Sequence, residues 1–150
     1  MSALLIGVIA GLRSMTAPAA VAWMAHAGQI DLANPWAAFL AWGPARWIFT
    51  LLALGELVAD KLPSTPSRKT AFPFGARIVT GGLAGAALCA AFGTTLSGLL
   101  AGVVGAVIGT LGGHAFRARL AAAIGSDLPA ALIEDAIAVG GAFAISALLR

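Results

Sequence analysis

Charged side chains are scarce in this chain of 150 residues: only 10% are Asp, Glu, Lys or Arg, whereas a soluble domain carries about 25%. None occurs in residues 78–116, a run nearly twice the roughly 20 residues that one bilayer crossing needs. This shortage excludes an ordinary cytosolic globular protein. With 60% hydrophobic residues and a mean hydropathy of +0.96, the sequence predicts a single all-α, polytopic membrane domain over residues 1–150.

The groups on which many enzymes and metal sites depend are also few. Cys89 is the only cysteine, so it cannot form an intrachain disulfide or a thiolate cluster, and we expect it to be a small packing residue. The two histidines, His26 and His114, lie far apart in the chain. No nucleophile with a base, phosphate-binding loop or metal-ligand spacing occurs. We therefore expect no catalysis, no metal and no cofactor.

The positive net charge has a membrane interpretation rather than a nucleic-acid one. A nucleic-acid-binding face needs clustered Lys and Arg, but the nine basic residues here are few and stand mainly beside apolar segments. The excess of Lys and Arg in cytoplasmic loops of membrane proteins accounts for this pattern. The expected partner is the lipid bilayer, and no nucleic acid is expected.

The first apolar segment, residues 2–27, is predicted to be a transmembrane helix. A cleaved signal peptide is the alternative, because residues 25–27 resemble a cleavage site. Against this alternative, no Lys or Arg precedes the apolar part, and Arg13 interrupts it.

The second apolar segment, residues 35–60, is predicted to be a helix kinked at Gly43–Pro44, because Pro44 cannot donate to the helical hydrogen-bond ladder. The alternative is an interfacial helix within residues 36–47 followed by a short crossing. Tryptophan prefers the membrane interface. One boundary of the membrane is therefore marked by Trp23, Trp36, Trp42 and Trp47.

Three more spans are predicted over residues 75–92, 95–116 and 128–149, with a turn at Gly93 and a helix cap at Ser126. A basic loop broken by prolines follows the second span, and a second basic loop follows the fourth span. The residues that make these two loops basic are Lys61, Arg68, Lys69, Arg117 and Arg119. Five spans then place both loops and the amino terminus on the cytoplasmic face of a bacterial inner membrane, with Arg150 outside.

Glycines in the fourth span repeat at intervals of four and three residues: Gly98, Gly102, Gly105, Gly109 and Gly112. This spacing forms a groove along one helix face, in which a neighbouring backbone can approach closely. Packing within the chain is the favoured interpretation, with Gly7, Gly11, Gly81 and Gly85 as matching faces. A homo-oligomer through the first four glycines of the stripe is the alternative.

The pattern Gly-x-Arg-x-x-Thr occurs twice, in residues 11–16 and 75–80. It is compatible with a duplicated helical hairpin followed by a fifth helix. In that arrangement the first and third spans run in the same direction across the membrane.

Ionisable groups inside apolar spans are costly, by about 2.5 to 3.5 kcal/mol each, and usually have a partner or a purpose. We expect all five spans to bring such groups to the inner third of the bilayer, with Arg13 and Glu134 as the leading pair. The candidate binding residues are Arg13, Thr16, Glu56, Asp60, Arg77, Thr80, His114, Arg117, Glu134 and Asp135. The set forms either an ion-pair lock between helices or a polar cavity that binds an ion, a proton or an anionic head group.

Four short motifs in order along the chain resemble a known family: residues 58–63 (Val-Ala-Asp-Lys-Leu-Pro), Arg77 opening a glycine-rich span, His114-x-x-Arg117, and Ser126 followed by Glu134-Asp135. They are similar to motifs of the bacterial integral membrane proteins grouped as the domain of unknown function 4126 family. That family often has a proline after the Arg77 position and a lysine at the Arg117 position. Ile78 and Arg117 depart from it, as in a short divergent member or a sister family. The resemblance implies an integral membrane protein and no known substrate.

Two functions remain from the sequence. In the first, a small polytopic inner-membrane protein binds or transports a small charged solute or ion through a cytoplasm-facing polar cavity. Arg13 and Arg77 would bind anionic groups, and Glu56, Glu134 and Asp135 would balance them or carry protons. In the alternative, a structural or assembly protein acts through helix–helix contacts and transports nothing.

Overall fold

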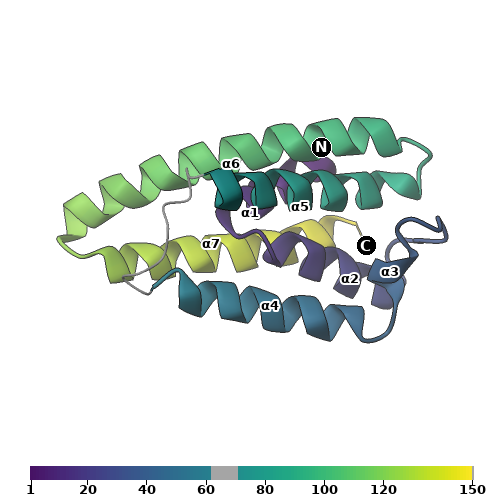
Figure 1. The fold of residues 1–150 in the computed structure, drawn as a ribbon, viewed down its shortest axis with the longest axis horizontal. Coiled ribbons are helices and arrows are strands. Elements are labelled where there is room, and N and C mark those ends of the chain that lie inside the picture. Colours follow the sequence, from purple (N-terminus) through teal and green to yellow (C-terminus); the bar gives the residue numbers. More distant parts are fainter. Residues whose placement is uncertain (62–70, 150) are drawn as a thin grey trace.

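The computed structural model describes residues 1–61 and 71–149. Within these residues the chain forms seven helices and no strand. Most of them lie along the long axis of an elongated bundle (Figure 1). The helices are α1 (Ser2–Leu12), α2 (Thr16–His26), α3 (Ala38–Ala41), α4 (Ala45–Ala59), α5 (Ala71–Ala90), α6 (Thr95–Ile124) and α7 (Asp127–Leu148). The predicted all-helical class is confirmed. In this part of the chain, α5, α6 and α7 are long and apolar enough to cross a membrane.

The first apolar segment folds as a hairpin of two helices, so the prediction of one transmembrane helix is wrong. α1 and α2 run in opposite directions (Figure 1). The tip of the hairpin at Arg13 bonds Asp135 in the first half of α7, whereas Gln29, just beyond α2, accepts a hydrogen bond from Ser146 near the end of α7. Each helix has 11 residues, about 16 Å, which is too short for a hydrocarbon core of about 30 Å.

This hairpin also changes the predicted topology. Because α1 and α2 return the chain toward the side from which it started, the amino terminus lies toward the end of the bundle opposite Lys61 (Figure 1). The prediction that it shares a face with both basic loops is therefore wrong. Of those loops, residues 62–70, with Arg68 and Lys69, lie outside the described residues.

The second predicted span is divided at Gly43–Pro44, the position where the sequence predicts a kink. The four-residue α3 ends before this dipeptide, and α4 begins directly after it at Ala45. Pro44 cannot continue a helical ladder, which explains the division. The rings of Trp23 and Trp47 meet edge to face at this end, with centroids 5.1 Å apart. The structure therefore does not confirm the count of five spans that the sequence predicts.

The three long helices begin and end close to the predicted positions, with one difference. Gly93 turns the chain between α5 and α6 with a φ of 67°. α6 continues through Arg117 to Ile124 and ends at Gly125, whose φ is 79°. The second basic loop is therefore mostly helical, because the alanine-rich sequence after Arg117 favours helix until a glycine ends it.

Glycines bring α1, α5 and α6 into backbone contact. A Cβ atom at Gly102 would collide with the carbonyl of Gly81 on α5, and one at Gly105 would collide with the carbonyl of Leu4 on α1. Gly98 and Gly109 make similar contacts with these two helices, whereas Gly112 has no neighbour within 4 Å and does not extend the stripe. The stripe therefore packs within the chain. An oligomer through the same glycines would require these contacts to separate.

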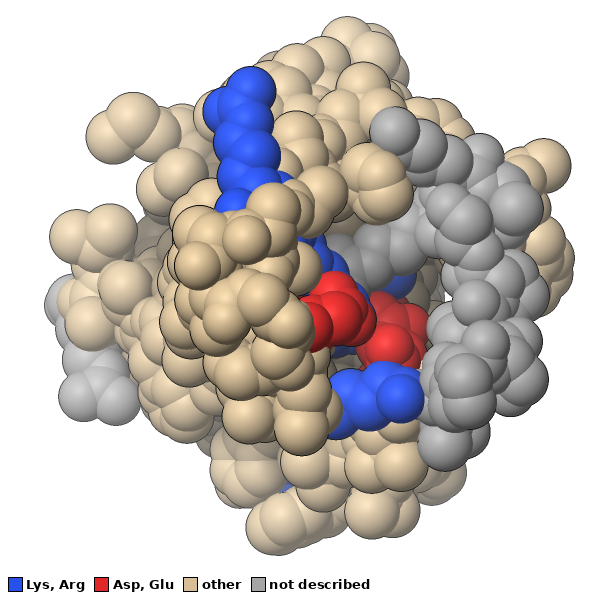
Figure 2. Space-filling view, turned by 90° about the vertical axis from the view of Figure 1, so that its left-hand side faces the viewer, with Lys and Arg blue, Asp and Glu red and all other residues tan. Residues whose placement is uncertain are grey.

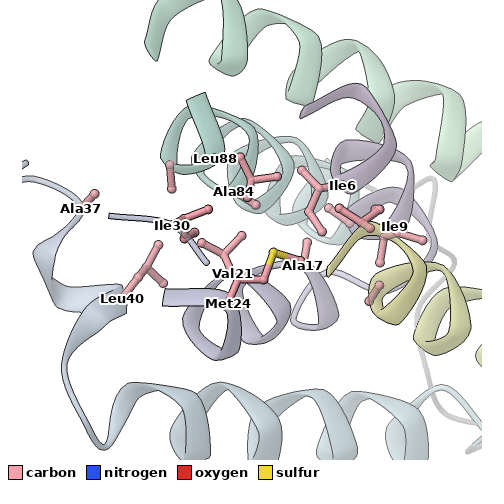
Figure 3. Packing of buried hydrophobic residues seen from close by; sticks show 14 of the residues in the cluster. Ile6, Ile9, Ala17, Val21, Met24, Ile30, Ala37, Leu40, Ala84 and Leu88 are labelled. Atoms are coloured by element: carbon pink, nitrogen blue, oxygen red, sulfur yellow. The ribbon is translucent and has the colours of Figure 1, made fainter. Parts of the chain in front are cut away.

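The apolar core lies beside this close-packed region, between α1, α2 and α5 (Figure 3). Ile6 and Val21 are fully buried there, and Leu88 of α5 packs with them. Cys89 contacts Gly98, as expected for a packing residue. The core holds the α1–α2 hairpin in place and so fixes the position of its polar tip.

The two copies of the Gly-x-Arg-x-x-Thr pattern have different structures. Residues 11–16 contain the break between α1 and α2, whereas residues 75–80 lie inside continuous α5. α1 runs antiparallel to α5, since it runs parallel to α6 and α6 runs antiparallel to α5. The predicted common direction is therefore wrong for α1.

Candidate functional site

The break between α1 and α2 is formed by Arg13, Ser14 and Met15. Arg13 has an extended backbone conformation at the end of α1. Pro18, the third residue of α2, has no N–H to donate to the Ser14 carbonyl, and its ring would clash with that carbonyl in a continuous helix. Proline is tolerated in the first turn of a helix, so the chain breaks before Thr16 and starts again.

Glu56 of α4 caps the start of α2 from another helix. The backbone N–H and the hydroxyl of Ser14 each donate to its Oε1 at 2.9 Å, and the Met15 N–H donates to its Oε2 at 2.9 Å. The first N–H groups of a helix have no partner within the helix and carry partial positive charge. The carboxylate from α4 binds the N–H groups of Ser14 and Met15, directly before α2, and so places negative charge at the positive end of this helix.

A basic side chain binds the end of α1, opposite in charge to the carboxylate at the start of α2. Arg77 of α5 donates from Nη1 to the Gly11 carbonyl at 3.1 Å. The Thr110 hydroxyl of α6 lies 3.2 Å from the same oxygen and 2.8 Å from the Ala106 carbonyl of its own helix. Arg77 also lies 3.5 Å from Glu56 Oε1 through Nη2. The two helix ends at the break are thus held by an ion pair whose charges match the helix dipoles.

Arg13 lies between two carboxylates and is fully buried. Its Nε donates to Asp135 Oδ1 at 2.7 Å, and its Nη1 donates to Asp60 Oδ2. Lys61 approaches Asp135 from the other side, with Nζ 2.6 Å from Oδ2 and 2.8 Å from the Leu57 carbonyl. Asp135 is therefore shared between two cations.

A second group of charges joins α6 to α7. Arg117 donates from Nε and Nη2 to the two carboxylate oxygens of Asp127, at 2.9 and 2.5 Å. Its Nη1 lies 3.7 Å from Oε2 of Glu134, which is fully buried. The predicted pair of Arg13 with Glu134 is therefore wrong: Arg13 pairs with Asp60 and Asp135.

We call these eight side chains the charged network: Arg13, Glu56, Asp60, Lys61, Arg77, Arg117, Glu134 and Asp135. Four are basic and four are acidic, and Asp127, which pairs with Arg117, adds a further carboxylate at its edge. The side chains of Glu56, Asp60 and Asp135 keep 11 to 14% exposure. Figure 2 shows acidic side chains in a hollow at this end of the bundle, with basic side chains beside them. Part of the network is thus accessible from the end that carries Lys61 and Arg117.

Three of the predicted site residues form no side-chain hydrogen bond or ion pair with the network among the described residues. The Thr80 hydroxyl donates to the Ala76 carbonyl of its own helix. Thr16 lines a separate cavity, and His114 is half-buried on α6. The sequence prediction did not include Lys61, whose ammonium donates to Asp135, or the backbone N–H of Ser14, which donates to Glu56. Pro18 was the signal for that break.

Comparisons with protein-family models, curated proteins and solved structures found no match for this chain. Within the residues that the structure describes, no group of three or more His, Cys, Asp or Glu side chains is arranged to hold a metal ion. The guanidinium of Arg13 lies between Asp60 and Asp135.

Proposed function

We propose that this membrane protein binds, and carries across the bilayer, a small charged solute or ion at the charged network. The observation that carries the proposal is a helix break whose two ends face buried charges. Irregular backbone at membrane depth is tolerated where it is buried in protein or lines a water-filled cavity. In many transporters, such discontinuous helices form the substrate and ion sites. The partial exposure of three carboxylates provides access to the site.

The pairing within the network favours a cation or a proton as the solute. Arg13 and Arg77 are occupied by carboxylates and by the Gly11 carbonyl, so an incoming anion would have to displace a buried acid. Lys61 is more accessible, with 25% of its side chain exposed. A small cation that replaced its ammonium at Asp135 would leave this carboxylate shared between two cations, as it is now.

A structural or assembly role is the second candidate. It is favoured by the ion pairing of every basic side chain in the network and by the glycine contacts of α1, α5 and α6. In this role the charges only fix the helices relative to one another.

Cation flux separates the two candidates. We expect purified protein in liposomes to dissipate a gradient of H⁺, Na⁺ or K⁺, and Asp135→Asn to abolish that flux while the protein remains folded. Asp31→Asn is the matched control, because Asp31 is exposed near the opposite end. Folded wild-type protein that moves none of these ions would refute the transport proposal and favour the structural role.

The resemblance to the domain of unknown function 4126 family supports the choice of site. Its short motifs are separate in the sequence, yet they contribute charges to one network: Asp60, Lys61, Arg77, Arg117, Glu134 and Asp135. We propose that the chain is a member or a close relative of that family, and that these residues are its binding positions.

We further propose that the protein resides in a bacterial inner membrane, with the Lys61 and Arg117 end in the cytoplasm. Basic residues are enriched in cytoplasmic segments, and Arg119 lies at the same end. Reporter fusions at the two chain ends should then both read periplasmic. Opposite readings would contradict the reversal of direction at Arg13.

A further inference from the structure

An apolar cavity of about 480 Å³ lies between α2, α4 and α7. Three alanines, one on each helix, leave space there: Ala20, Ala53 and Ala142. The other lining residues include Trp23, Met24, Leu54, Leu57 and Phe143. Its volume falls within the range of about 300 to 1,000 Å³ that is usual for ligand sites.

The cavity faces the surface that a bilayer would cover. α4 and α7 both pack against α2 but do not pack against each other along their lengths, so the cavity lies in the gap between them. Leu54 and Phe143 line it and are also 52% and 73% exposed. An apolar chain from the surrounding bilayer can therefore reach it directly.

One end of the cavity carries an unbalanced positive charge. The guanidinium of Arg46 lies over the rings of Trp23 and Trp47, 5.4 and 5.7 Å from their centroids, and Trp23 also lines the cavity. Its hydrogen bonds leave from Nη1, to the Gly43 carbonyl and to His26 Nδ1, both at 2.9 Å. In the described part of the chain, its buried Nε has no acceptor and no carboxylate forms an ion pair with it.

We propose that this cavity binds one acyl chain of an anionic phospholipid whose phosphate pairs with Arg46. A guanidinium matches phosphate oxygens through parallel N–H donors, and tryptophans lie at the level of lipid head groups. The opposite end of the cavity reaches Thr16 and Leu57, beside the charged network. Each basic side chain there already has a carboxylate partner, so the head group is attracted to the Arg46 end.

Competition between two lipids tests the proposal. Detergent-solubilised protein is mixed with equal amounts of dioleoyl phosphatidylglycerol and dioleoyl phosphatidylcholine, and bound lipid is counted by native mass spectrometry. We expect the anionic lipid to exceed the zwitterionic one by about tenfold, which corresponds to about 1.4 kcal/mol. Equal binding by the wild-type protein would overturn the proposal without the need for any variant.

Two variants locate the head group and the acyl chain. Arg46→Gln should remove the preference for the anionic lipid, whereas Arg119→Gln, at an exposed arginine near the other end, should retain it. Ala20→Leu should lower the occupancy of both lipids by filling the cavity. A preference unchanged in Arg46→Gln would overturn the assignment of the head group. A protein dimer that Ala20→Leu dissociates would assign the cavity to a second copy of the chain instead.

Discussion

On one side of the bundle α1, α5 and α6 touch backbone to backbone, whereas on the other side α2, α4 and α7 surround a cavity of about 480 Å³. Both sides are rich in small residues. Because glycine has no side chain, helices that meet at glycines approach until their backbones are in van der Waals contact. Such contact is a main source of helix association in lipid. Alanines on helices that stay farther apart leave space instead. The comparison indicates a rigid side and a side with room for a ligand.

The charged network lies where these two sides meet. The end of α1 belongs to the close-packed side and is held by Arg77 of α5. The start of α2 belongs to the side with the cavity and is held by Glu56 of α4. Arg13, between the two helices, joins α4 to α7 through Asp60 and Asp135. A change in the network should therefore affect how the two sides fit together.

Removal of Arg13 should break this junction and have the largest effect. Arg13→Met leaves Asp60 and Asp135 with one cation fewer in a buried site, and loss of one partner from a buried ion pair costs about 3 to 5 kcal/mol. The free energy of unfolding in detergent micelles, measured by denaturant titration, should fall by about that amount.

A second charge change should restore most of that stability. Arg13→Met combined with Asp60→Asn removes one charge of each sign, and Asp135 keeps Lys61 as its partner. Arg119→Met, at an exposed site, should alter stability by less than about 0.5 kcal/mol. A double variant as unstable as Arg13→Met alone would show that the loss comes from packing rather than from unbalanced charge.

Substitution of a single glycine should disrupt the close packing of α1 against α6. Gly105→Leu would drive a side chain into the Leu4 carbonyl of α1, and we expect a loss of about 1 to 3 kcal/mol from overpacking. Gly112→Leu is a matched control on the same helix, because no atom lies within 4 Å of its Cβ position. Thermal unfolding in detergent should distinguish the two, and equal melting temperatures would contradict the contact.

The long helices were predictable because their boundaries depend on local signals. The charge-free run, Gly93 and the Ser126 start place α5 and α7 within a few residues, whereas α6 continues past its predicted end at Phe116 to Ile124. The hairpin was not predicted, because a straight helix and a reversed pair of short helices have the same hydropathy. Only Pro18 distinguishes them locally.

The partners of Arg13 depend on helix rotation, which hydropathy does not determine. Glu134 and Asp135 are adjacent, so their side chains leave α7 about 100° apart, and only one of them faces Arg13. Lys61 follows the end of α4 in the sequence, where it is predicted to be a loop residue. Its bond to Asp135 arises because α4 ends beside α7. The sequence therefore predicts which charges are buried, but not which of them pair.

The smallest change in stability is expected at the cavity. The test compares the same substitution, alanine to leucine, at two positions. Ala20 lines the cavity, so we expect the larger side chain of Ala20→Leu to occupy part of the cavity and to add apolar contacts. The stability of this variant should be unchanged or higher by about 0.5 to 2 kcal/mol, as for other cavity-filling changes. Ala84 is fully buried beside Ile6 and Leu88, so Ala84→Leu should cost about 1 to 3 kcal/mol. Both variants are measured by thermal unfolding in lipid-free detergent, where no acyl chain competes for the cavity. If Ala20→Leu destabilised the protein as much as Ala84→Leu, the α2, α4 and α7 side would be as tightly packed as the glycine side, and the contrast between them would be lost.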